Sequence, residues 1–92
     1  MRALTGVDHI ATSTNALSIT AEKIADVRPS RHRIVIRNND GAIVVYVGPT
    51  SSVSSTVGFA IGAGVREEFD YSGELWAIAA SGTPSIAIAE EY

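Results

Sequence analysis

The chain has 92 residues, of which 46% are hydrophobic and 18% charged, and its formal net charge is −3. This balance is typical of one small folded domain and excludes an intrinsically disordered chain. A net negative charge argues against a general nucleic-acid-binding protein. Cysteine is absent, which excludes disulfides and thiolate metal sites. No stretch is long and apolar enough for a signal peptide or a membrane span. We therefore expect a chain made in the cytoplasm that binds neither nucleic acid nor membrane.

The first third of the chain is weakly patterned. Residues 1–15 are expected to form an N-terminal arm or edge segment, with a possible strand over 9–13, and residues 16–92 are expected to form a single domain. Residues 16–30 fit both a helical spacing and two short strands. We favour strands there because every later element is β-like.

The segment RHRIVIRNNDGAIVVYVG, residues 31–48, carries the clearest pattern. Its first arm alternates, and its second arm is apolar on both faces, as in a central strand covered on both sides. The Asp-Gly pair between the arms predicts a tight hairpin in which Gly41 takes a positive φ. In the first arm, the face predicted to point inward holds His32, Ile34, Ile36 and Asn38, and the other face holds Arg31, Arg33, Val35 and Arg37.

Four further strands are expected after a polar loop at residues 49–56. They fall within residues 58–64, 65–71, 74–81 and 85–91, and the SGTP segment between the last two predicts a short hairpin loop. Seven or eight short strands with frequent turns predict an all-β fold, a small antiparallel β-sandwich that is either jelly-roll-like or immunoglobulin-like. The expected core comprises Ile34, Ile36, Val45, Val47, Phe59, Ile61, Phe69, Leu75, Ile86 and Ile88.

Residues that carry chemistry are sparse. Of the two histidines, His32 lies on a predicted inward face, where a structural role is the simpler interpretation. Glu67 and Glu68 are adjacent on a strand and point to opposite faces, so they cannot form one acid–base pair. The glycines of residues 58–64 lack the Gly-Lys-Ser/Thr sequence of a phosphate-binding loop. We expect no enzyme activity, no catalytic residue, no metal site and no cofactor.

The arginines of the first arm have two interpretations. Arg31, Arg33 and Arg37 can form the solvated face of a sheet, paired with acids such as Glu68 or Asp70 on a neighbouring strand. Such exposed pairs contribute about 0.2–1 kcal/mol each. Alternatively, the stripe docks on an acidic protein surface, where charge guides the approach and sets the register.

The order of these motifs resembles a small β-sandwich family found among virion proteins of tailed bacteriophages. The resemblance covers about residues 28–90: RHRIVIRNND, then VVYVG, a Ser/Thr loop, GFAIGAG, and DYSGELWAIAASGTPSIAIAEE. Members often carry prolines in the Gly-Phe…Gly segment, where this chain has Ala60 and Gly62. The resemblance implies a structural protein, foremost a head decoration or cement protein on the capsid surface, often trimeric at symmetry axes. It transfers no catalytic residue.

We therefore expect a homo-oligomer, with a trimer favoured, that binds the major capsid protein or another virion protein. A neck, tail or fibre-associated protein and a carbohydrate-binding adhesion module are the alternatives, the last using Tyr71 or Trp76 as a stacking platform. Trp76 and Ile78 lie opposite Leu75 on their strand, so their face is either covered or a contact surface. The residues predicted for a protein interface are Arg31, Arg33, Arg37, Val44, Tyr46, Trp76 and Ile78.

Overall fold

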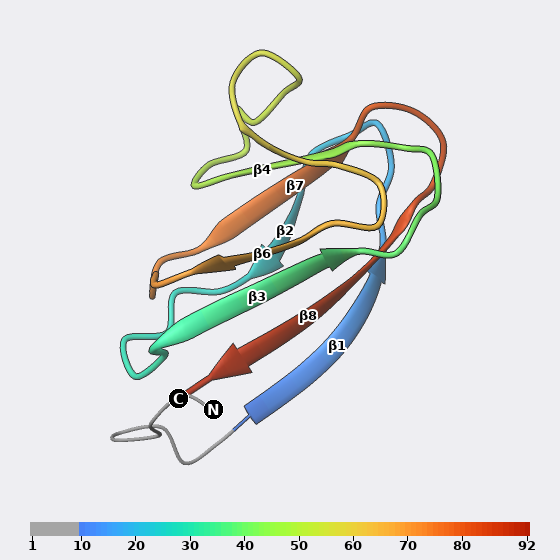
Figure 1. The fold of residues 1–92 in the computed structure, drawn as a ribbon. Coiled ribbons are helices and arrows are strands. Elements are labelled where there is room, and N and C mark those ends of the chain that lie inside the picture. Colours follow the sequence, from blue (N-terminus) through green and yellow to red (C-terminus); the bar gives the residue numbers. More distant parts are fainter. Residues whose placement is uncertain (1–9) are drawn as a thin grey trace.

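The computed structural model describes residues 10–92 and contains eight strands in two four-stranded antiparallel sheets (Figure 1). Within this part of the chain, no helix is long and apolar enough to cross a membrane. The strands are β1 (Ile10–Ala16), β2 (Glu22–Ala25), β3 (Arg33–Asn38), β4 (Val45–Gly48), β5 (Phe59–Ile61), β6 (Arg66–Phe69), β7 (Leu75–Ala79) and β8 (Ser85–Glu91).

The strand order is that of a jelly roll. The first sheet has the order β1-β8-β3-β6 and the second β2-β7-β4-β5, so the chain crosses between sheets at almost every connection. The pair β4 and β5 is the exception, since these consecutive strands are hydrogen-bonded neighbours. Eight strands wound in this way form two facing sheets with an apolar layer between them. The predicted small β-sandwich is confirmed, and the strand order selects its jelly-roll form.

The two predicted hairpins are wrong. β3 and β4 lie in different sheets, and so do β7 and β8. Each predicted hairpin loop is a connection across the sandwich instead. An Asp-Gly turn reverses the chain locally, but it does not determine whether the next strand pairs with the last one or crosses to the facing sheet.

Side chains rather than glycine geometry build the turn after β3. The carboxylate of Asp40 accepts hydrogen bonds from the backbone N–H groups of Ala42 and Ile43, both at 2.8 Å. These two bonds lower the pKa of Asp40, the Ile43 bond more than the Ala42 bond. Gly41 does not take the expected positive φ; within residues 10–92, positive φ occurs at Gly64 and Gly82.

The core between the sheets matches most of the predicted set. The exception is Phe59, which is 49% exposed at the start of edge strand β5. Phe69 is partly buried and meets Phe59 edge-on, with ring centroids 5.5 Å apart. The other eight predicted residues are buried, and the core also includes Leu17, Ala25, Ala77 and Ala79.

Candidate protein-interaction surfaces

Arg31 is a buried structural residue, with only 4% of its surface exposed. Its Nε donates to the carbonyl of Tyr71 at 2.9 Å, and its Nη2 donates to the carbonyl of Gly73 at 2.5 Å. Its Nη1 donates to the carbonyl of Asp26 at 3.1 Å and to Oε1 of Glu90 at 2.6 Å. One guanidinium thus joins the β2–β3 connection, the β6–β7 connection and strand β8. The prediction that Arg31 belongs to an exposed stripe is wrong.

The two-residue alternation of β3 does not extend to Arg31 and His32. β3 begins at Arg33, so Arg31 and His32 precede the strand and do not follow its two-residue period. As a result their environments are reversed: Arg31 is buried, and His32, predicted to point inward, is exposed. Asn38, at the other end of β3, is buried as expected and donates through Nδ2 to the carbonyls of Ile43 and Ile61, at 2.7 and 3.0 Å.

Arg33 and Arg37 lie on the outer face of the first sheet but differ in their partners. Arg33 forms ion pairs with Glu68 at 2.6 Å and Asp70 at 3.4 Å on and after neighbouring strand β6. This confirms the predicted cross-strand pairing for that residue. Arg37 is exposed and forms no ion pair within residues 10–92. Its neighbour across the strand pair is Arg66, a like charge.

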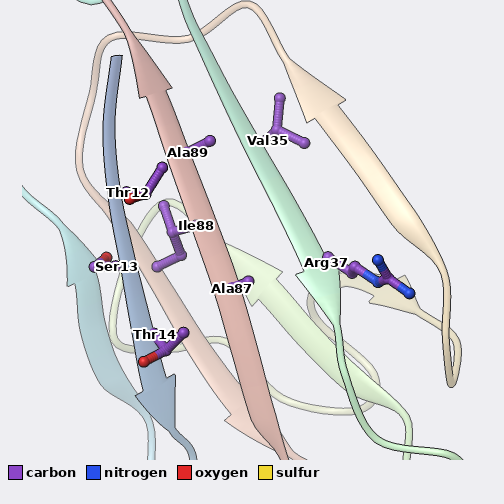
Figure 2. A pocket seen from close by; sticks show the side chains of 8 residues that line it. All are labelled: Thr12, Ser13, Thr14, Val35, Arg37, Ala87, Ile88 and Ala89. Atoms are coloured by element: carbon purple, nitrogen blue, oxygen red, sulfur yellow. The ribbon is translucent and has the colours of Figure 1, made fainter.

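A shallow groove runs beside Arg37 over the outer face of the first sheet, with a volume of about 340 Å³. Figure 2 shows Thr12 and Thr14 on one side, with Val35 and Arg37 on the other. The small side chains of β8, Ala87 and Ala89, form the floor between them. The groove is open, and the described residues that line it include no carboxylate and no histidine.

The other predicted interface residues gather on the outer face of the second sheet, which we call the Trp76 face. It is made up of four half-buried residues, Val44, Tyr46, Trp76 and Ile78. In the β4–β7 pair, Tyr46 lies opposite Ile78 and the buried Gly48 lies opposite Trp76, while Val44 directly precedes β4. Apart from the buried Arg31, the predicted set therefore divides between the outer faces of two different sheets, and it does not form one surface.

Charged side chains border the Trp76 face near β2. The indole N–H of Trp76 donates to Glu74 at 3.1 Å. Lys23, which lies opposite Trp76, pairs with Asp26 at 3.0 Å and approaches Glu74 at 3.9 Å. The hydrogen bond and the charge of Asp26 raise the pKa of Lys23. An aromatic and aliphatic centre with a polar border is a common composition of protein interfaces.

A second groove, of about 660 Å³, lies between the two sheets where β5 and β6 leave them open. Its apolar lining includes Phe59, Phe69 and the exposed Val57, and the groove is also lined by Asp70 and Tyr71, which directly follow β6. The sequence pattern does not indicate this groove, because it predicts Phe59 in the core. The signal was the glycine-rich context of Phe59, which favours a strand end over a strand centre.

Within residues 10–92, no three histidine or acidic side chains are grouped closely enough to hold a metal ion. No protein-family model matches the chain, and no curated protein matches it. A solved structure does: the stem and receptor-binding domain of the spike protein P1 from bacteriophage PM2, with a TM-score of 0.63 and 12% sequence identity. The match covers 83% of this chain and 31% of the spike chain. At this identity the likeness concerns the fold.

Proposed function

We propose that the chain is a structural protein of a bacteriophage particle, and that it acts as a decoration protein on the outside of the assembled head. The observation that carries this proposal is the jelly-roll likeness to a domain of a phage spike protein. The order of the strand and turn motifs over residues 28–90, which resembles small virion proteins of tailed phages, supports it independently. Jelly rolls are also a common architecture of viral capsid proteins.

The mechanism we propose is adhesive. A protein that binds only the folded, assembled form of its partner stabilises that form by mass action. The Trp76 face supplies the apolar contact, with the major capsid protein or another virion protein as partner. Arg37 lies on the outer face of the other sheet and takes no part in this contact. Nothing in this mechanism requires a cofactor or a catalytic group.

Co-sedimentation with undecorated heads tests this proposal. We expect the purified chain to pellet with heads at a near-stoichiometric copy number, and Ile78→Lys to weaken binding because it places a charge in the Trp76 face. Val35→Lys is the matched control, since Val35 is also half-buried but lies on the outer face of the other sheet. Failure of the unmodified chain to bind heads would exclude the decoration role.

The second candidate is a receptor-binding or tail-associated module. The spike likeness favours it, because the matched chain includes a receptor-binding domain. The apolar groove beside Phe59 and Tyr71 is a candidate ligand surface for this role. Immunogold labelling of particles separates the two functions: label over the head supports decoration, whereas label at a tail or spike supports the second candidate. A glycan array tests carbohydrate binding directly.

A further inference from the structure

Three of the four edge strands carry features that block pairing with another strand. β5 is only three residues long. β6 has the charged residues Arg66, Glu67 and Glu68 in its four positions. β2 contains Glu22 and Lys23 and has a register shift after Lys23. Short length, charge and bulges are the usual means by which folded proteins prevent their sheet edges from associating.

The fourth edge strand, β1, has none of these features. It is seven residues long, with the sequence IATSTNA, and contains no charged residue and no proline. All seven residues pair with β8 without a register shift, so the strand is regular along its whole length. Thr12, Ser13 and Thr14 at its centre are exposed. Because alternate residues of an edge strand direct their N–H and C=O groups outward, β1 presents a row of hydrogen-bonding groups that no second strand within residues 10–92 pairs with.

We propose that β1 pairs antiparallel with β1 of a second copy of this chain, about a two-fold axis through Ser13. The strand is complementary to itself in that register. Ser13 faces Ser13 of the second copy, and Thr12 faces its Thr14, while Ile10 faces its Ala16. Cross-strand threonine pairs are favourable, and the register brings no like charges together. A two-fold contact of this kind uses the same surface on both copies.

The pairing joins the first sheets of two copies into one continuous sheet of eight strands. Thr12 and Thr14 also form one side of the groove over β8, so the joined sheet carries two such grooves related by the axis (Figure 2). The Trp76 face belongs to the other sheet and stays free in the dimer. The dimer therefore leaves the surface proposed for head binding available, and it does not depend on that proposal.

Charge substitutions at the threonine pair test the register. Thr12→Lys with Thr14→Lys places two like-charge pairs across the axis, and we expect self-association to weaken by about tenfold or more. Thr12→Lys with Thr14→Glu is the matched control, because the same register then creates two opposite-charge pairs and association is retained. Analytical ultracentrifugation over a concentration series measures both variants, and circular dichroism establishes that each is folded.

Disulfide trapping tests the axis itself. The chain contains no cysteine, so Ser13→Cys introduces its sole thiol. Residues directly opposite in an antiparallel pair have Cα atoms about 4.5–5.5 Å apart, which a disulfide can span. Ile10→Cys is the control, since in the proposed register its two copies lie six residues apart along the strand, roughly 20 Å. We expect Ser13→Cys to form covalent dimers on mild oxidation and Ile10→Cys to form few.

Several outcomes would overturn the inference. The chain could stay monomeric at high concentration, or the two cysteine variants could cross-link equally. The third such outcome is a trimer that still forms when Thr12→Lys and Thr14→Lys are combined. If the isolated chain is monomeric but the β1 amides are protected from hydrogen exchange in particles, the occupant of the edge is a strand of another virion protein.

Discussion

Replacing Arg31 with alanine is expected to destabilise the fold strongly. The guanidinium is fully buried, and its removal leaves the Glu90 carboxylate and three backbone carbonyls without their donor. Removing one member of a buried ion pair costs about 3–5 kcal/mol. In a domain of this size each kcal/mol lowers the melting temperature by about 4–8 °C. We therefore expect the melting temperature to fall by about 12 °C or more in thermal unfolding followed by circular dichroism.

Arg33→Ala is the control for this experiment. Arg33 also pairs with two carboxylates, Glu68 and Asp70, but these pairs are partly exposed to solvent and are expected to contribute less than about 1 kcal/mol. Arg31→Lys keeps the charge but cannot reproduce the planar set of donors, so its stability should lie between those of the unmodified chain and Arg31→Ala. Equal losses for Arg31→Ala and Arg33→Ala would refute the assignment of Arg31 as the structural arginine.

Four further substitutions test the connections between strands. Asn38→Ala should cost about 1–3 kcal/mol in urea unfolding, because two buried backbone carbonyls lose their donor; a change below the error of the measurement would contradict this. Gly82→Ala should cost about 1–2 kcal/mol, since Gly82 has a φ of +60° and a Cβ there would lie 3.1 Å from a methyl group of Ile43. Gly41→Ala should be tolerated, because neither φ nor space opposes it, and equal losses at the two glycines would disprove the distinction. The lowered pKa of Asp40 means that its carboxylate stabilises the fold above the usual pKa of 3.8, and that this contribution is lost as the pH falls through the lowered value. Melting curves across acid pH should therefore show a smaller acid destabilisation for Asp40→Asn, and parallel pH profiles would argue against it.

Local patterns predicted the strands well, because strand formation depends on alternation and β-branched residues near one another in sequence. The alternation within β3 and β7 placed Ile34, Ile36 and Leu75 in the core, and the structure confirms this. The pairing of strands could not be predicted in the same way. Each strand of a jelly roll finds its neighbours across the sandwich, and a turn such as that at Asp40 has the same local chemistry in a hairpin and in a crossing.

For the residues predicted to form an interface, the local pattern likewise predicts which face of a strand a side chain occupies, but not which distant groups it contacts. The sequence places Trp76 and Ile78 on the face opposite Leu75, and the structure confirms that they share an outer face with Tyr46. The environment of Arg31 depended on groups far away in sequence, namely Tyr71, Gly73 and Glu90. A short-range pattern carries no information about such partners, so Arg31 resembled its surface neighbours.

The position of β8 between β1 and β3 has a consequence for synthesis. Ile10 at the start of β1 lies opposite Glu91, so the first and last described strands are direct partners. The first sheet lacks an inner strand until residues 85–91 have left the ribosome. Folds dominated by such distant pairings form in about milliseconds to seconds. We therefore expect this domain to fold as one cooperative unit once residues 85–91 have left the ribosome, because the apolar layer between the sheets is incomplete without β8.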